Sequence, residues 1–382
     1  MAAPLTIVGS GLAAYNLARE WRKHAPDAEL CIVTADAGDF YSKPMLSNGL
    51  NANKTAAQLA MKSAEKMAEE LKATLLTHTR VSAIDRAAHE IETSAGRLAY
   101  SQLVLALGAD STRAELGGNA AEAVLRVNDL ADYAIYREAL DGKQRVVLLG
   151  GGLIGCEFAN DLVATGHQVE VVDIAAWPLS RFLPEAAGHW MAQRLSAAGI
   201  RFHWQQQALR LDHDEDGYLL TLSDGTVLKA DVVLSALGLR PRTALAAAAG
   251  LATSRGIVVD RHLRSSDPDI YALGDCAEVE GLVLPFVLPI MQAARALAPT
   301  LAGQATALAY PAMPVVVKTP ACPAVIAPPA SACAGEWQIE SGADGLRALY
   351  CDAAGKLQGL VLLGEATKER QTLAAQLPAT LA

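Results

Sequence analysis

The sequence predicts an α/β protein built from two Rossmann-like three-layer domains that bind dinucleotides, followed by a small α+β domain at the C-terminus. Two glycine-rich turns predict the paired domains: a GxGxxA pattern begins at Gly9 and a GxGxxG pattern begins at Gly150. Each turn stands between an apolar run and a helix-like run. A third observation is the change in composition beyond about Met313, where proline and small residues precede new strand-like runs.

An internal duplication sets the expected domain boundaries. Gly108 and Gly238 close two similar halves, and a third glycine signature follows the second half. If this signature belongs to the first domain, the second domain is inserted into it. We therefore expect a first domain over residues 1–111 and 243–313, a second over residues 112–242, and a C-terminal domain over residues 314–382.

The first half of the chain is expected to open with a βαβ unit. Its strand Leu5–Val8, helix Leu12–Trp21 and strand Leu30–Val33 follow one another directly. Lys43 is expected to be extended, because a following proline disfavours the helical conformation of its predecessor. The later elements are expected to be a helix at Ala56–Ala73 and strands at Val81–Ile84, Glu90–Thr93 and Leu103–Leu107.

The second half repeats this alternation and then changes character. A Ser-Asp-Gly turn separates two apolar runs, and Pro289 is expected near the first position of a later helix. The last segment contains strand-like runs without intervening helices, which indicates antiparallel strands. The expected strands are Val146–Leu149, Val169–Asp173, one ending at Ser235–Pro241, Leu346–Tyr350 and Leu357–Leu362.

Composition and charge exclude several functional classes. The net charge of −9 argues against a nucleic acid partner, since phosphate binding needs clustered cations. The chain has no uncharged apolar run of about 18 residues and no signal-peptide pattern, so we expect no membrane insertion and a cytoplasmic location. The 6 cysteines form no CxxC pair and the 8 histidines form no ligand pattern, so no metal site is predicted.

The first glycine turn has the residues that a bound pyrophosphate requires. Gly9 permits the tight turn, Gly11 lets the backbone approach the phosphates, and Ala14 lets the helix pack close to the strand. The pyrophosphate then lies at the helix N-terminus, where free N–H groups favour an anion. Asp36 follows the second strand and is the candidate for binding ribose hydroxyls. Without the flanking strand and helix, the same residues would indicate only a tight turn.

The second glycine turn contains all three glycines of the pattern, at Gly150, Gly152 and Gly155. Asp173 ends the next strand, where an aspartate accepts hydrogen bonds from a 2′-hydroxyl and repels a 2′-phosphate. No arginine or lysine follows it in residues 174–177, so NADH is expected rather than NADPH. Glu157 is expected on the first turn of the next helix. Two interpretations of Glu157 stay open: a favourable charge at a helix N-terminus, or a role near the nicotinamide.

The third signature places Gly274 and Asp275 after the strand-like run Ile-Tyr-Ala-Leu. A carboxylate there can accept hydrogen bonds from ribityl or ribose hydroxyls of a flavin. Taken alone, an ordinary Gly-Asp turn explains it better, and the signature becomes specific only beside the two upstream turns. Two dinucleotide sites in one chain predict a protein that moves electrons between them.

Together these motifs resemble the FAD-dependent pyridine nucleotide–disulfide oxidoreductase superfamily, and within it the bacterial rubredoxin–NAD(+) reductases. The resemblance spans essentially the whole chain. It implies FAD in the first domain, NADH in the second, and a small C-terminal domain near the flavin. It also implies electron delivery to rubredoxin, a small acidic iron–sulfur protein. The most specific segments are 41–47 (YSKPMLS), 152–162 (GLIGCEFANDL), 238–243 (GLRPRT), 271–279 (YALGDCAEV) and 313–323 (MPVVVKTPACP).

The resemblance also assigns further residues to the two sites. Lys43 and Pro44 match the segment beside the isoalloxazine. Lys318 matches a lysine near the flavin that would favour its reduced form and help to dock an acidic protein; the alternative is a solvated strand lysine. Arg240 and Arg242 are expected to be structural. The remaining assignments are Val81, Ala106, Gly108 and Val287 for FAD, and Ile154 and Gly238 for NADH.

No side chain is expected to act as acid, base or nucleophile. Disulfide reductases need a CxxxxC pair beside the flavin, and related peroxidases need a single cysteine; here Ser47 stands where that thiol would be. The cofactor therefore carries the chemistry. The expected protein is an NADH-dependent reductase of rubredoxin, monomeric or dimeric. The alternatives are a ferredoxin reductase of an oxygenase system, an NADH oxidase or peroxidase, and a redox-sensing protein that binds FAD and NADH.

Overall fold

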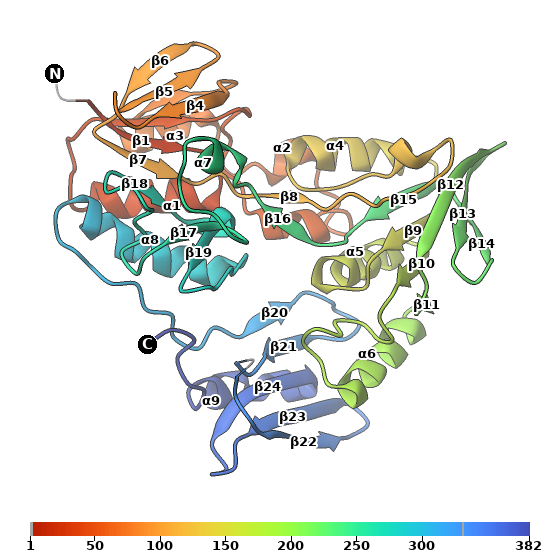
Figure 1. The fold of residues 1–382 in the computed structure, drawn as a ribbon. Coiled ribbons are helices and arrows are strands. Elements are labelled where there is room, and N and C mark those ends of the chain that lie inside the picture. Colours follow the sequence, from red (N-terminus) through yellow and green to blue (C-terminus); the bar gives the residue numbers. More distant parts are fainter. Residues whose placement is uncertain (1–2, 331) are drawn as a thin grey trace.

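The computed structural model describes residues 3–330 and 332–382, arranged in three lobes (Figure 1). The first lobe is built on a five-stranded parallel sheet in the order β18-β7-β1-β2-β3. Because β18 follows the second lobe in sequence, the chain returns to the first sheet after leaving it. The strands are β1 (Leu5–Val8), β2 (Leu30–Val33), β3 (Thr74–Leu76), β7 (Gln102–Leu105) and β18 (Ile270–Ala272).

Helices cover one face of this sheet and a small β-meander lies over the other (Figure 1). Strands β1 and β2 are buried along their whole length, as expected for parallel strands covered on both faces. This confirms the predicted three-layer arrangement. The covering elements are α1 (Leu12–Arg22) packed against α8 (Val287–Leu301), and the meander β4 (Val81–Asp85), β5 (Glu90–Thr93) and β6 (Gly96–Ala99); α7 (Ala244–Ala248), β17 (Ile257–Val259) and β19 (Ala277–Val279) complete the lobe.

Two local predictions for this lobe are wrong. The long helix expected over Ala56–Ala73 is two helices, α2 (Ala56–Leu59) and α3 (Ala64–Leu71). The chain between them is extended because Lys62 pairs with Phe40. Lys43 is also not extended: it begins the 3-10 helix η1 (Lys43–Asn48), with Pro44 in its first turn, where no donated N–H is required.

The second lobe repeats the parallel architecture in a four-stranded sheet of order β11-β10-β9-β15. The expected strands Val146–Leu149 and Val169–Asp173 are found within one residue of their predicted bounds, as parts of β9 and β10. The strands are β9 (Arg145–Leu149), β10 (Gln168–Asp173), β11 (Ile200–Trp204) and β15 (Val232–Ser235), with helices η2 (Ala121–Ala123), α4 (Leu130–Ala139), α5 (Leu153–Ala164) and α6 (Glu185–Ala197) and the meander β12 (Ala208–Asp214), β13 (Gly217–Leu222) and β14 (Val227–Ala230).

Two short antiparallel strands, β8 (Ala109–Ser111) and β16 (Leu239–Pro241), connect the first two lobes (Figure 1). Arg242 follows β16, and its Nε donates to Asp110 Oδ1 at 2.7 Å across this connection. Its Nη1 also donates to Leu107 O at 3.1 Å. Arg242 therefore has the structural role that was expected of it.

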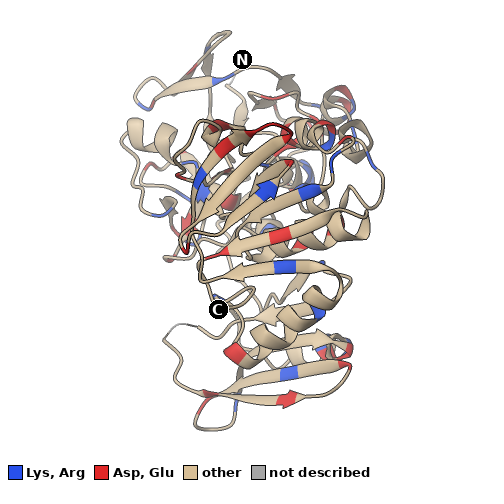
Figure 2. Cartoon of the chain, turned by 90° about the vertical axis from the view of Figure 1, so that its right-hand side faces the viewer, with Lys and Arg blue, Asp and Glu red and all other residues tan. Residues whose placement is uncertain are grey.

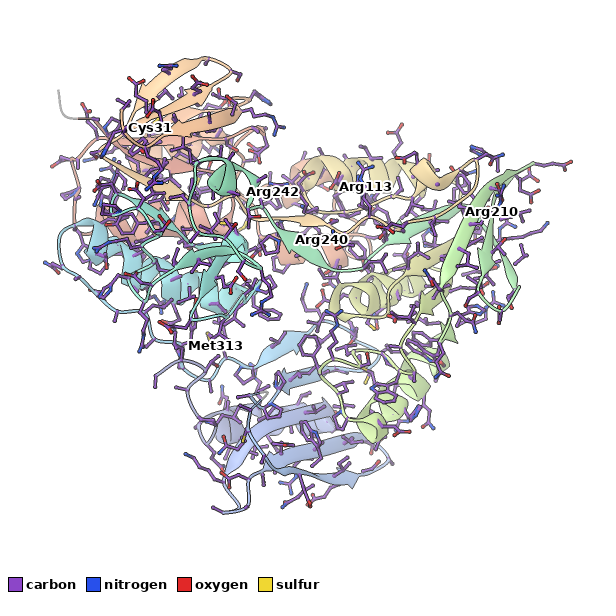
Figure 3. All side chains as sticks on the ribbon, in the orientation of Figure 1. Cys31, Arg113, Arg210, Arg240, Arg242 and Met313 are labelled. Atoms are coloured by element: carbon purple, nitrogen blue, oxygen red, sulfur yellow. The ribbon has the colours of Figure 1, made fainter. Side chains whose placement is uncertain are left out.

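The third lobe is an antiparallel sheet of order β20-β21-β24-β23-β22, entered just after Met313 (Figure 3). One set of its buried residues shares an apolar core with the second lobe, so that Val361 belongs to the same cluster as Trp190 of α6. A second set, which includes Leu360 and Leu362, forms a separate core within the third lobe. Trp190 Nε1 donates to Gly342 O at 3.3 Å across the contact. The elements are β20 (Val315–Val317), β21 (Ala324–Ala327), β22 (Glu336–Ser341), β23 (Gly345–Cys351), β24 (Leu357–Gly364), η4 (Glu365–Glu369) and α9 (Arg370–Ala374).

Acidic and basic residues are interspersed along the chain on the side of the molecule that carries β12–β14 and the third lobe (Figure 2). Several of them form ion pairs along one strand or across neighbouring strands, as Arg210 does with Asp212 and Arg347 with Glu340. Across residues 3–330 and 332–382, no helix has the length and apolar character needed to cross a membrane.

Candidate functional site

The first glycine turn joins β1 to α1 and forms an open cradle. Gly9 has a φ of +115°, and a Cβ at this residue would lie 2.3 Å from Ala106 O. Gly11 is the N-cap residue of α1, and a Cβ on it would point into open space. No side chain of the described residues caps α1, so its first N–H groups are available to an anion. Ala14 is fully buried, which allows the close contact of helix and sheet.

Asp36 lies beside this cradle, held by three donors. Ser10 Oγ, Thr34 Oγ1 and the Gly38 N–H donate to Asp36 Oδ1 at 2.8, 2.7 and 2.9 Å. One carboxylate oxygen is thus engaged by the protein, which fixes the orientation of the other at an exposed position. Ser10 and Thr34 were missed by the sequence reasoning, although both belong to the segments that flank the turn.

The second glycine turn repeats this geometry between β9 and α5. Gly150 has a φ of +106°, and a Cβ on Gly155 would lie 1.9 Å from Gly150 O. Gly152 is the N-cap residue of α5, again without a side-chain cap within the described chain. Asp173 stands beside the turn, where its Oδ2 accepts the Gly151 N–H at 2.5 Å. The turn and the end of β10 are therefore fixed to each other as one unit.

Lys43 of η1 and Asp275 of the 3-10 helix η3 (Gly274–Cys276) lie near enough for each charge to influence the other. Burial raises the pKa of Asp275, and the Lys43 ammonium opposes that shift. Burial likewise lowers the pKa of Lys43, and Asp275 is the first charge that counters it. Lys43 Nζ donates to Asn128 Oδ1 at 3.1 Å, so a residue of the second lobe positions it. Asn128 was not predicted, since only the fold brings it here.

Other predicted residues lie around these turns. Gly108 and Gly238 have φ values of +71° and +99°, and a Cβ on either would meet open space. Gly274, at φ +81°, touches α1, because a Cβ there would lie 2.8 Å from Ala13 Cβ. The remaining three residues are Ile154 in the first turn of α5 (40% exposed), Val287 at the start of α8 (37% exposed) and Val81 at the start of β4.

Glu157, Ser47 and Lys318 form a junction of the three lobes. Ser47 Oγ donates to Glu157 Oε2 at 2.5 Å, and the Lys318 N–H donates to Glu157 Oε1 at 2.9 Å. Lys318 Nζ lies 3.1 Å from Glu157 Oε2. It also donates to Asn48 Oδ1 at 2.8 Å and to Pro44 O. One ammonium group thus links η1, α5 and β20.

This junction changes the interpretation of Glu157 and Lys318. Helix α5 starts at Leu153 and has no acidic residue in its first turn, so the predicted first-turn position of Glu157 is wrong. Glu157 is only 7% exposed and is satisfied by the junction instead. The Lys318 side chain is 33% exposed and ion-paired, which does not fit a lysine that is simply solvated.

Two further polar residues of α5 were missed from the sequence. Asn160 Oδ1 accepts the Ala321 N–H at 3.0 Å, which fixes the segment after β20. Asp161 accepts the Leu50 and Asn51 N–H groups at 3.0 and 3.1 Å. Both side chains are buried, so the signal in the sequence was a polar pair that follows Glu157 on a largely apolar helix.

The buried cysteines offer no reactive thiol. Burial raises the pKa of Cys31 and of Cys276 to about 11, and that of Cys322 to about 12. It also raises the pKa of Cys156, which lies on α5. A thiol with such a pKa is protonated at neutral pH and is a poor nucleophile. Together with the serine at position 47 of η1, this argues against thiol chemistry at the site.

Comparisons with known proteins agree with this geometry. Residues 3–302 match the pyridine nucleotide-disulphide oxidoreductase family, and residues 307–377 match the rubredoxin binding C-terminal domain. The chain is 48% identical to a rubredoxin-NAD(+) reductase of Alcanivorax borkumensis, covering 99% of each chain, and 46% identical to one of Acinetobacter baylyi, covering 98% of each. The solved structure of a ferredoxin reductase from Rhodopseudomonas palustris is similar with a TM-score of 0.88 and 28% identity, over 98% of this chain and 95% of that one.

Proposed function

The chain belongs to the pyridine nucleotide-disulphide oxidoreductase family, and from this premise we propose that it transfers electrons from NADH through FAD to rubredoxin. The observation that carries the proposal is the junction of Ser47, Glu157 and Lys318. It joins the lobe of each glycine turn to the lobe that matches a rubredoxin binding domain. The lobes that we assign to electron entry and to electron exit therefore meet at this junction.

We assign FAD to the first lobe, with the domain boundaries at residues 111/112, 242/243 and 313/314. The cradle of Gly9 and Gly11 fits a pyrophosphate, because its helix N-terminus is uncapped by any described side chain and its second glycine faces open space. Asp36 would hold the ribose of the bound cofactor, and Lys43 and Asp275 would hold its central part. When bound, FAD accepts a hydride and releases electrons singly, which lets a two-electron donor serve a one-electron acceptor.

We assign NADH to the Gly150–Gly155 turn of the second lobe. The carboxylate of Asp173 is held beside the turn by the Gly151 N–H and by the Ala175 N–H at 2.8 Å. Fixed there, it would accept hydrogen bonds from the adenosine ribose of bound NADH and would repel a 2′-phosphate. The apolar side chain of Ile154 projects from the first turn of α5 and offers a surface for the nicotinamide half.

The protein side chains bind and orient, and none acts as a nucleophile. Ser47 replaces a thiol, and its hydroxyl is already used to hold Glu157. Lys318 supplies a fixed positive charge beside η1, and so opposes the cost of adding negative charge to a neighbouring group. The pairing of Lys318 with Glu157 also keeps the third lobe in place against the segment that contains Lys43 and Pro44.

A ferredoxin reductase activity is the second candidate, because the chain is also similar to a solved ferredoxin reductase over nearly its whole length. The match of residues 307–377 to the rubredoxin binding domain favours rubredoxin. The two acceptors are distinguished by steady-state kinetics of the FAD-loaded protein with NADH and with purified rubredoxin or ferredoxin. We expect kcat/KM for rubredoxin to exceed that for ferredoxin, and the reverse order would assign the second activity.

A further inference from the structure

The segment of residues 41–61, here called the strap, belongs to the first lobe by sequence but packs into the second. Its base is pinned in the first lobe, where the Phe40 N–H donates to Lys62 O at 2.9 Å and the Met61 N–H donates to Phe40 O at 2.8 Å. Leu46 and Leu59 of the strap are buried in the apolar cluster of the second lobe. The residues beside the proposed flavin site are therefore supported mainly by the lobe that we assign to NADH.

Polar contacts from α4 and α5 fix the far end of the strap. Asp161 is 3% exposed and accepts two consecutive backbone N–H groups, one on each carboxylate oxygen: Leu50 on Oδ2 and Asn51 on Oδ1. From α4, Tyr133 Oη donates to Lys54 O at 3.0 Å. Asp161 is the charged member of this set that binds the strap backbone directly, so its loss leaves the Leu50 and Asn51 N–H groups without their acceptor in the protein.

Asp161 and Glu157 are four residues apart and thus lie on one face of α5. Glu157 holds Ser47 of the strap, and Asp161 holds Leu50 three residues later. The same helix begins at the proposed NADH turn. Its position therefore sets the distance between the nicotinamide end of that turn and the strap residues Lys43 and Pro44.

We propose that Asp161 is a positioning residue for hydride transfer, whose ionised carboxylate clamps the strap to α5 and so aligns the two cofactor sites. This inference rests on the proposed function, because it concerns the transfer from NADH to FAD. Asp161 contacts neither nucleotide turn and acts on hydride transfer only through the strap. Its loss should slow electron entry and leave electron exit to rubredoxin unchanged.

The surroundings of Asp161 make the clamp sensitive to pH. Burial raises the pKa of Asp161 to about 6, against the opposing effects of the two N–H groups and of nearby cations. The carboxylate is therefore ionised at pH 7.5 and becomes largely neutral near pH 5. The groups that face it are Lys318 from the third lobe, Arg137 and the neutral phenols Tyr133 and Tyr136 from α4, and Glu157 on its own helix.

The test compares FAD-loaded wild type with D161N, D161E and the control D231N. Asp231 is a matched control, since it also accepts two consecutive N–H groups in the second lobe, from Gln144 and Arg145, but does not touch the strap. We expect D161N to slow flavin reduction by NADH about ten-fold or more at pH 7.5. It should also lose the decline in rate that wild type shows below about pH 6. D161E should recover part of the rate, and D231N should match wild type.

Amide hydrogen exchange of the peptide containing residues 49–54 provides a readout that is independent of turnover. D161N should raise exchange there at least about ten-fold, while D231N leaves it unchanged. Unchanged exchange, or flavin reduction within two-fold of wild type, would overturn the inference. If NADH fails to reduce the wild-type flavin, the proposed function fails, but the exchange measurement still decides whether Asp161 clamps the strap.

Discussion

Replacing Glu157 with glutamine tests the junction of the three lobes most severely. Glutamine keeps the size of the side chain and removes its charge. The present carboxylate accepts from Ser47 Oγ at 2.5 Å and from the Lys318 N–H at 2.9 Å, and it ion-pairs with Lys318 Nζ at 3.1 Å. The glutamine amide nitrogen cannot accept, so at least one of these donors loses its partner.

The expected loss of stability follows from burial. Removing one partner of a fully buried ion pair costs about 3–5 kcal/mol. The Glu157 side chain is 9% exposed but that of Lys318 is 33% exposed. Water therefore screens part of the Lys318 charge that is left without its partner. We therefore expect the free energy of unfolding to fall by about 1–2 kcal/mol. Because the strap is also held here, flavin reduction by NADH should slow about ten-fold.

The assays are urea unfolding followed by far-UV circular dichroism and anaerobic stopped-flow reduction of the flavin. Glu170→Gln is a suitable control: Glu170 pairs with Arg201 at 2.8 Å and with His203 at 2.7 Å in the second lobe, away from the junction. It should lower stability without slowing reduction. If Glu157→Gln unfolds at the same urea concentration as wild type and is reduced as fast, the junction does not hold the lobes as described.

Three further predictions concern the second lobe. Gly155→Ala places a Cβ 1.9 Å from Gly150 O, so NADH titration should give no flavin reduction while dithionite still reduces the bound FAD; normal reduction by NADH would contradict the assignment of this turn. Asp173→Ala removes a negative charge beside the proposed ribose site, so the ratio of kcat/KM for NADH over NADPH should fall at least about ten-fold; an unchanged ratio would place the determinant elsewhere. Burial raises the pKa of Asp231, but hydrogen bonds from Arg145 outweigh it and hold the pKa at about 2. Its stabilisation is thus present above the unfolded value near 4 and is lost as pH falls towards 2. Asp231→Asn should cost about 2 kcal/mol at neutral pH in urea unfolding, and a difference from wild type that persists at pH 2 would refute this.

Local signals explain why much of the fold could be predicted. The strands ending at Gly9 and Gly150 are short apolar runs, and the glycines after them adopt the positive φ that the turns require. The parallel sheets follow from the alternation of strand-like and helix-like runs. The return of the chain to the first lobe is indicated by the third glycine signature, and the antiparallel third lobe by strand-like runs without intervening helices. These features depend on neighbouring residues in the sequence, where a pattern can be read directly.

What could not be predicted depends on contacts between distant segments. The break between α2 and α3 comes from the pairing of Lys62 with Phe40, for which the only local signal is Ser63, the N-cap of α3. The docking of the strap on α5 places Asp161 against Leu50 across more than 100 residues of sequence. The core shared by the second and third lobes likewise exists only once α6 meets β24.

The most direct test of the account is an anaerobic double-mixing experiment on the FAD-loaded protein. NADH is added first and the flavin absorbance is followed; oxidised rubredoxin is then added and its own absorbance is followed. The account predicts rapid loss of flavin absorbance, then reduction of two rubredoxins for each NADH as the flavin is reoxidised. Flavin that is reduced by NADH but passes no electrons to rubredoxin would contradict it.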